Sequence, residues 1–204
     1  MSEPPSALLL VLFLILTTGF FVAAEFSLVK VRQTRIEELA DAGAFGAKKA
    51  LSALKNLDGY LYATKLGVML ATLVLGKVGD PAFEHILGPA VGWISAGFRP
   101  LALTFLALLV VGILEFMFGE LIPTTLALKF SEKILLNTIL PLSWFYTLFQ
   151  WPITGMKKFV GVLLRPFGMS GGGHGDEAHS EDEIRKIVTR SGADGTIEIG
   201  RAHV

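Results

Sequence analysis

Residues 6–29 read SALLLVLFLILTTGFFVAAEFSLV and carry a single charged side chain, Glu25. A helix needs about 20 predominantly apolar residues to cross a hydrocarbon core of roughly 30 Å, so this stretch is long enough to span a bilayer. Two further stretches meet the same requirement: residues 60–78, which include Lys65 and Lys77, and residues 101–128, which include Glu115 and Glu120. We therefore predict an all-α integral membrane protein with three transmembrane helices.

The composition of the whole chain agrees with this class. Of 204 residues, 52% are hydrophobic and only 18% are charged, and the mean hydropathy is +0.58. A soluble domain normally carries more charge and less apolar surface. The formal net charge is +0, so nothing indicates a nucleic-acid partner. The absence of cysteine excludes disulfides, thiolate metal sites and a cysteine nucleophile.

The charged residues of the loops predict the orientation. Six basic residues follow the first span: Lys30, Arg32, Arg35, Lys48, Lys49 and Lys55. The loop over residues 79–100 has Arg99 as its one basic residue, beside Asp80 and Glu84. Because short cytoplasmic loops carry the excess of lysine and arginine, we expect an outside N-terminus and a cytoplasmic C-terminus, in a multi-pass protein of the cell membrane.

The loop between the first two spans, about residues 34–57, is itself expected to be helical. Thr34 and Glu37 have the spacing of a capping box, and Gly43 and Gly46 then interrupt the helix. The following piece, residues 47–57, carries lysines on one side only. We predict amphipathic helices that lie against the inner leaflet.

Residues 134–164 are apolar enough for a fourth span, and that alternative stays open. Lysines precede and follow the segment, however, so both of its ends have a cytoplasmic character. Pro141 and Pro152 each remove a helical donor, and Trp144 and Trp151 are of a type that settles at headgroup level. We predict a broken interfacial or re-entrant helix.

The composition changes to Gly, His, Asp, Glu and Ser after residue 167. Such a segment cannot bury a core. We therefore assign residues 1–167 to a transmembrane domain and residues 168–204 to a linker with a short helix, opened by Ser180 and Glu183, that leads to a cytosolic domain absent from this chain.

Charged side chains inside the spans are the candidates for function, because each costs at least about 2.5–3.5 kcal/mol at the bilayer centre. Lys77 lies near the outer end of its span and can extend to the headgroups. Lys65 can do the same, or it can pair with Glu25 or Glu120.

Glu120 belongs to the sequence FGELIP, residues 118–123. Pro123 has no N–H, so in an α-helix the Gly119 carbonyl loses its partner inside the membrane. A free carbonyl beside a carboxylate supplies the hard oxygen ligands that Mg²⁺ or Ca²⁺ requires. The alternative is a packing kink in which Glu120 is neutralised or paired with Lys65.

Three other positions extend this candidate site. Glu25 is expected at the same depth as Glu120, with Ala23 and Ala24 forming a small face beside it. The hydroxyls of Ser27 and Thr72 are further possible ligands, or they bond back to carbonyls of their own helices. Glu115 lies about 140° from Glu120 around an α-helix and is expected on another face.

Several of these segments resemble the CorC/CNNM family of Mg²⁺ transporters: residues 20–28 (FFVAAEFSL), residues 66–68 (LGV) with 70–73 (LATL) and 75–76 (LG), and residues 118–123 (FGELIP). The resemblance implies a homodimeric three-span domain with a juxtamembrane helical belt, followed in the complete protein by a cytosolic pair of CBS domains. It implies Mg²⁺ efflux in exchange for Na⁺, with a dehydrated Mg²⁺ bound inside the membrane. The family's ion-binding positions carry over to Glu120, Gly119, Glu25, Ser27, Ala24 and Thr72.

Two other classes of function remain. A non-transporting Mg²⁺-sensing scaffold would keep the site without ion flux. A membrane-embedded enzyme would need a second catalytic group facing Glu120, and the sequence holds no nucleotide-binding, serine-hydrolase or metalloprotease motif. We expect no enzymatic activity.

Overall fold

A computed structural model describes residues 4–92, 94, 95 and 97–164. The assignment of residues 168–204 to a linker and short helix lies outside these residues. The described elements are α1 (Pro4–Lys30), α2 (Gln33–Asp41), α3 (Ala47–Leu54), α4 (Leu57–Leu87), the 3₁₀ turn η1 (Gly88–Val91), α5 (Arg99–Leu114), the π-helix η2 (Glu115–Leu121), α6 (Ile122–Lys129), α7 (Ser131–Leu148) and α8 (Gln150–Leu164). No strand occurs within the described ranges.

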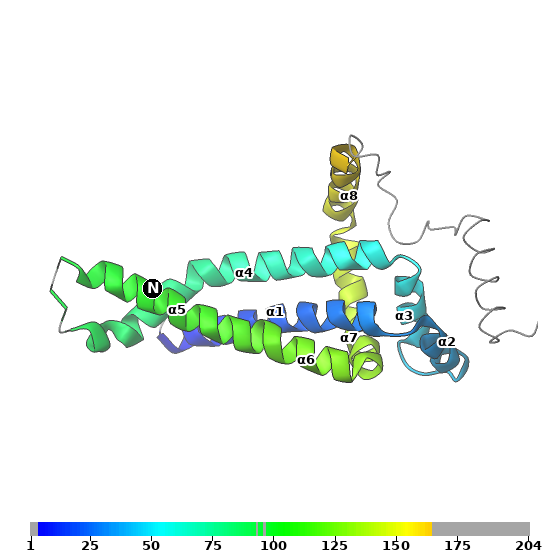
Figure 1. Ribbon diagram of the computed structural model, residues 1–204, viewed down its shortest axis with the longest axis horizontal. Helices are drawn as coiled ribbons and strands as arrows, with labels where there is room; N and C mark the ends of the chain where they lie inside the picture. Colours follow the sequence, from blue (N-terminus) through cyan, green and yellow to red (C-terminus); the bar gives the residue numbers. More distant parts are fainter. Residues whose placement is uncertain (1–3, 93, 96, 165–204) are drawn as a thin grey trace, which may run out of the picture.

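Three long helical rods form the body of the molecule: α1, α4, and the continuous run α5–η2–α6 (Figure 1). Their apolar parts are Ser6–Lys30, Leu57–Gly79 and Arg99–Lys129, each long enough to cross a membrane. The prediction of an all-α protein with three spans is confirmed. The second helix differs from expectation in length, because α4 begins at Leu57 and continues to Leu87.

The first span is the central one. Of its apolar window 44% is buried within the chain, against 11% for the third span. Helix α1 packs against α4, η2, α6 and α7. The third span therefore presents most of its apolar surface outward, to lipid or to another chain.

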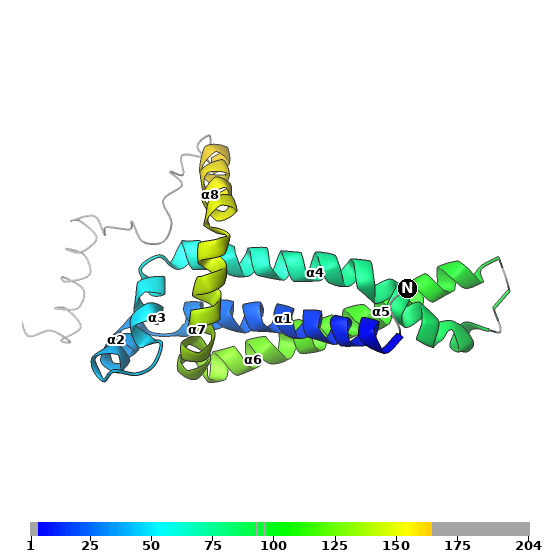
Figure 2. The same ribbon diagram turned by 180° about the vertical axis from the view of Figure 1, so that it is seen from behind.

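Helices α7 and α8 run across the long axis of the body (Figure 1, Figure 2). This direction agrees with an interfacial pair rather than a fourth span. The break falls at Phe149, between the two helices and three residues before Pro152. Pro152 has no N–H for the Leu148 carbonyl four residues earlier, where α7 ends, whereas Pro141 lies inside α7 and does not end it.

The main apolar core lies where α1 and α4 meet the short helices. Ala47, Ala50 and Ala53 form a fully buried face of α3, and Leu135 and Ile139 of α7 belong to the same core region. Gly46 precedes α3 with φ +78°, and a Cβ there would lie 2.8 Å from the Leu136 carbonyl oxygen. Small residues thus let α3 approach α7 closely.

The predicted capping box at the start of α2 is wrong. Helix α2 begins at Gln33, one residue before Thr34, and its N-cap residue, Arg32, makes no side-chain capping bond. Glu37 instead accepts a hydrogen bond from the Gln33 side chain at 2.9 Å. The local pairing at i,i+4 has replaced the cap.

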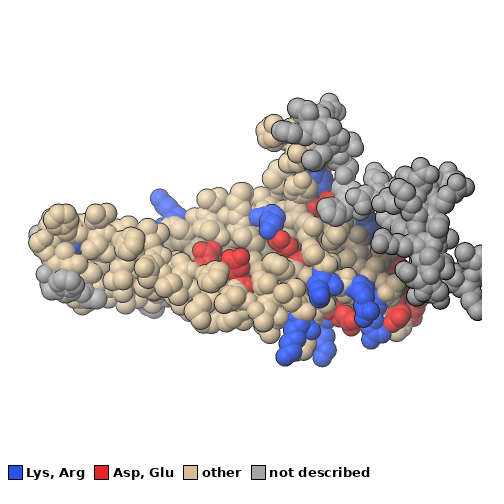
Figure 3. All heavy atoms as spheres, in the orientation of Figure 1, with Lys and Arg blue, Asp and Glu red and all other residues tan. Residues whose placement is uncertain are grey.

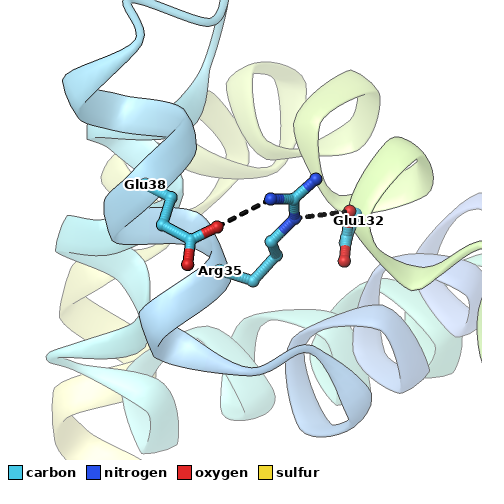
Figure 4. A network of polar contacts seen from close by, with 3 residues as sticks. All are labelled: Arg35, Glu38 and Glu132. Carbon is cyan, nitrogen blue, oxygen red and sulfur yellow. Dashed lines mark hydrogen bonds and ion pairs between the residues drawn. The ribbon is translucent and has the colours of Figure 1, made fainter.

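Arg35 joins α2 to α7. Its guanidinium lies 2.6 Å from Glu38 and 3.4 Å from Glu132, which lies in the first turn of α7 (Figure 4). Hydrogen bonds and the negative charge of these carboxylates raise the pKa of Arg35, so it stays charged. Basic side chains gather at this end of the body (Figure 3). A cytoplasmic position for this end remains a prediction.

Candidate metal centre in the third span

The third span changes its hydrogen-bond register at the predicted site. Residues Glu115–Leu121 form a π-helix, in which the Ile122 N–H donates to the carbonyl of Met117, five residues earlier. In this register residues five apart, such as Glu115 and Glu120, lie nearer in angle around the helix than the roughly 140° expected from an α-helix. Their surroundings still differ, because Glu115 is half-buried and Glu120 is exposed. Such π-helical turns are rare and recur at functional sites.

The same register changes which carbonyl Pro123 deprives of a donor. After Ile122 and Met117, the next pair would be residue 123 and Phe118, and proline has no N–H. The carbonyl that Pro123 leaves without a donor in this register is therefore that of Phe118, one residue before Gly119, whose carbonyl the sequence predicted to be free. Phe118 O lies 3.0 Å from the point that a Cβ on Gly19 would occupy, so the glycine of α1 lets this oxygen approach.

Gly119 is buried between the third and first spans. A Cβ on Gly119 would lie 3.4 Å from Glu115 Cγ and 3.4 Å from Thr18 Cγ2. Thr18 is 4% exposed, and its hydroxyl has no hydrogen-bond partner. The neighbouring Thr17 differs, because its hydroxyl donates to the Phe13 carbonyl at 2.7 Å.

Thr72 is engaged with Glu115. Its hydroxyl donates to Glu115 Oε1 at 2.8 Å, which ties α4 to η2. Sequence reasoning placed Thr72 near the ion but missed this partner. The sequence does carry a signal for this contact. Thr72 and Glu115 are polar residues near the middle of two apolar spans, and polar groups at such a depth tend to pair with one another.

Glu25 is engaged with Lys65. The Lys65 ammonium lies 2.8 Å from Glu25 Oε1, and the Thr64 hydroxyl lies 3.4 Å from Oε2. Pairing with Glu25 was one of the alternatives left open for Lys65.

Ala24 and Ser27 lie in the buried core. Both are fully buried, and the Ser27 hydroxyl donates to the Ala24 carbonyl at 2.9 Å. Ser27 thus follows the back-bonding alternative for its hydroxyl.

Glu25 and Glu120 do not share one depth. The π-helix meets α1 at Thr18 and Gly19, and Glu25 is six residues further along α1, a rise of about 9 Å. The structure therefore groups Gly119, Glu115 and Thr72 with Thr18, and it separates Glu25, Ala24 and Ser27 from them.

Glu120 itself is exposed on the surface of the single chain. Within the described part of the chain it makes no hydrogen bond or ion pair. Acidic side chains lie on the largely uncharged middle of the body, and a basic side chain lies close to them (Figure 3). The described residues include no group of three or more His, Cys, Asp or Glu side chains that could hold a metal. Hydroxyl and carbonyl oxygens must supply further ligands for any ion bound here.

Comparisons with known proteins identify the family of this chain. A match to the cyclin M transmembrane N-terminal domain, CNNM, covers residues 9–200. The chain is 36% identical to UPF0053 protein YrkA of Bacillus subtilis over 189 residues, which is 90% of this chain and 43% of that protein. It is 33% identical to UPF0053 protein YugS of the same organism over 192 residues, 93% of this chain and 45% of that protein.

A cyanobacterial relative matches over a similar range. UPF0053 protein sll0260 of Synechocystis is 27% identical over 198 residues, 91% of this chain and 41% of that protein. The chain thus spans less than half the length of these relatives. The resemblance drawn from the sequence is confirmed: the chain belongs to the CorC/CNNM family, a family related to magnesium transport, through its transmembrane domain.

Proposed function

We propose that this domain moves Mg²⁺ out of the cell across the plasma membrane in exchange for Na⁺, and that it acts as a transporter rather than an enzyme. The observation that carries the proposal is the π-helix Glu115–Leu121 in the middle of an apolar span. It combines an unpaired carboxylate, Glu120, with a carbonyl, Phe118 O, that has lost its donor. Interrupted helices with free carbonyls are where membrane transporters bind ions.

The chemistry of these groups suits Mg²⁺. This small cation takes oxygen ligands in a near-octahedral shell and is commonly held by one or two carboxylates together with water. Glu120 supplies a carboxylate that needs a counter-charge, because an unpaired charge in a span costs several kcal/mol. Glu25 is a weaker candidate, because Lys65 already compensates its charge.

The proposal includes a homodimer. Thr72 and Glu120 are exposed on the single chain, at mid-span positions where lipid would surround them. Polar groups at this depth face a bundle interior or a water-filled cavity. A second copy of the chain would provide that interior, and alternating access would then arise from movement of the two copies around the site.

The proposal also includes a cytosolic region beyond the residues of this chain. The relatives are more than twice as long as the matched part. We propose that a cytosolic pair of CBS domains follows in the complete protein and regulates transport.

The test is Mg²⁺-dependent thermal protection of the purified chain, together with Mg²⁺ flux in liposomes. Glu120→Gln should abolish both while the fold is kept, because a neutral amide leaves too little charge to offset the dehydration of Mg²⁺. Glu37→Gln, an acidic residue of α2 outside the spans, is the matched control and should retain both. Protection without flux would instead identify a Mg²⁺-sensing scaffold. Full protection of Glu120→Gln would contradict the assignment of Glu120.

A further inference from the structure

Helix α8 divides its residues between two sides. On the side of the body, Ile153 is fully buried in the main core and Lys157 lies against α4. On the other side, six residues fall within an arc of about 120° around the helix, and all six are exposed and none is polar. We call them the α8 face: Trp151, Pro152, Gly155, Phe159, Val162 and Leu163.

The α8 face requires a partner. Trp151 is 91% exposed, the largest fraction among the large apolar residues that the structure describes. Helix α8 projects from the body past α4 (Figure 1, Figure 2). An exposed apolar surface of this kind marks a contact with another protein or with a membrane.

The depth of α8 favours the membrane. The Lys157 ammonium lies 3.4 Å from Asn56 Oδ1 and 6.0 Å from the centre of the Tyr62 ring. Asn56 directly precedes the second span, which begins at Leu57. Helix α8 therefore crosses α4 where the hydrocarbon core gives way to headgroups, and it runs along the plane of the membrane. Tryptophan and amphipathic helices both settle at this level.

The charge of α8 indicates which lipids it prefers. The helix contains Lys157 and Lys158 and no acidic residue. Lys157 is engaged with α4, whereas Lys158 is exposed and takes part in none of the ion pairs of the described residues. Around the helix Lys158 lies only about 20° from Trp151, at the edge of the α8 face. A free ammonium beside an apolar surface at headgroup level attracts negatively charged lipid.

We infer that the α8 face and Lys158 form a binding site for anionic phospholipid in the leaflet around this end of the body. Trp151 and Phe159 insert among the upper parts of the acyl chains, and the Lys158 ammonium binds the phosphate of a headgroup. A zwitterionic lipid brings its own positive charge to the same place, so a lipid with a net negative charge binds more tightly. This site is independent of the proposed ion transport.

Trp151 itself reports on the contact with lipid. In a chain that carries Trp93→Phe and Trp144→Phe, it is the one remaining tryptophan. In phospholipid vesicles without Mg²⁺, lipids brominated near the top of the acyl chains should quench its fluorescence strongly, and aqueous iodide should quench it weakly. Quenching by iodide alone would place the α8 face in water. Quenching by neither would mean that a protein surface covers it. Either result would overturn the inference.

The preference for charge is measured in the same vesicles. Brominated phosphatidylglycerol should compete for the site better than brominated phosphatidylcholine, and added salt should reduce the difference. Lys158→Gln should lower this preference about fivefold, the effect of one basic residue at a charged surface. Lys48→Gln, which removes an exposed charge from α3, is the matched control and should keep the preference.

Two results would contradict the assignment. Equal quenching of the parent reporter by the two brominated lipids would mean that the site does not select anionic lipid. An equal loss of preference in Lys48→Gln and Lys158→Gln would mean that the net charge of this end, not α8, sets the preference. If the reporter chain does not fold, an environment-sensitive fluorophore on a cysteine at Phe159 gives the same measurement with all three tryptophans in place.

Discussion

The carboxylate of Glu25 lies 2.8 Å from the ammonium of Lys65, and the pair joins α1 to α4 inside two apolar spans. The Glu25 side chain is 15% exposed and that of Lys65 is 71% exposed. Glu25 has thus lost most of its solvation, and Lys65 provides the opposite charge from the open side. A carboxylate compensated in this way is a poor ligand for a second cation, so we interpret the pair as structural.

Lys65→Met should destabilise the domain. The change leaves the mostly buried Glu25 carboxylate without its counter-charge, and we expect a loss of about 1–3 kcal/mol, limited by the exposure of Lys65. The additional change Glu25→Gln should restore part of this loss, because no charge is then left unpaired. Unfolding of the four proteins of this double-mutant cycle in one detergent gives the coupling.

Lys77→Met is the matched control for Lys65→Met. Lys77 lies on the same helix, is exposed and sits near the opposite end of the span. Its replacement should change stability by less than about 0.5 kcal/mol. Equal effects of the two lysine variants would show that the contact with Glu25 contributes nothing.

Gly67→Ala should also destabilise the domain, through packing. A Cβ at Gly67 would lie 2.5 Å from three atoms of the Phe21 ring. That ring cannot move freely, because Phe20 and Phe145 hold it with centroid distances of 5.2 Å and 4.8 Å. Overpacking of this kind costs about 1–3 kcal/mol. Thermal unfolding of the purified chain measures it.

Gly155→Ala provides the opposite expectation. Gly155 lies in α8, and nothing lies within 4 Å of its Cβ position. Alanine has the higher helix propensity by about 0.8–1 kcal/mol, so this variant should be neutral or more stable. A loss of stability in both glycine variants would mean that the contact with Phe21 is not the cause in Gly67→Ala.

The spans could be predicted from the sequence because hydrocarbon thickness and residue rise determine them almost alone. The run over residues 6–29 needs no tertiary information to be recognised. The start of α4 at Leu57 was missed by three residues, because Leu57 and Asp58 belong to the helix but are not part of its apolar run.

The candidate site is harder to predict from the sequence, because it depends on the hydrogen-bond register of one helix and on contacts between helices. Nothing in FGELIP distinguishes a π-helical from an α-helical register, yet in the π-helical register it is the Phe118 carbonyl that Pro123 leaves without a donor. The depth of Glu120 relative to Glu25 likewise follows from the contact between Gly119 and Thr18, a relation between helices that no single helix encodes.

The orientation in the membrane can be tested directly, because the chain has no native cysteine. A single cysteine at Ser95, in the loop after α4, should react with an impermeant thiol reagent from outside intact cells. One at Ser52, exposed on α3, should react only after permeabilisation. Labelling of Ser52 from outside would reverse the predicted topology.

The proposed dimer makes a prediction about one face of α4. Lys65, Met69, Thr72 and Gly76 are all exposed and follow a spacing of three and four residues, so they form one stripe that contains the polar mid-span residue Thr72. Val74 is 46% exposed but lies about 200° from Thr72 around the helix.

If a second copy shields the polar groups, a cysteine at Met69 should be joined to its counterpart by a short bis-maleimide in bilayers and give a species of twice the mass. A cysteine at Val74 should face lipid and stay unjoined. Joining at Val74 without joining at Met69 would place the second copy on the wrong face to cover Thr72, and joining at neither position would leave Thr72 facing lipid, against the dimeric ion site.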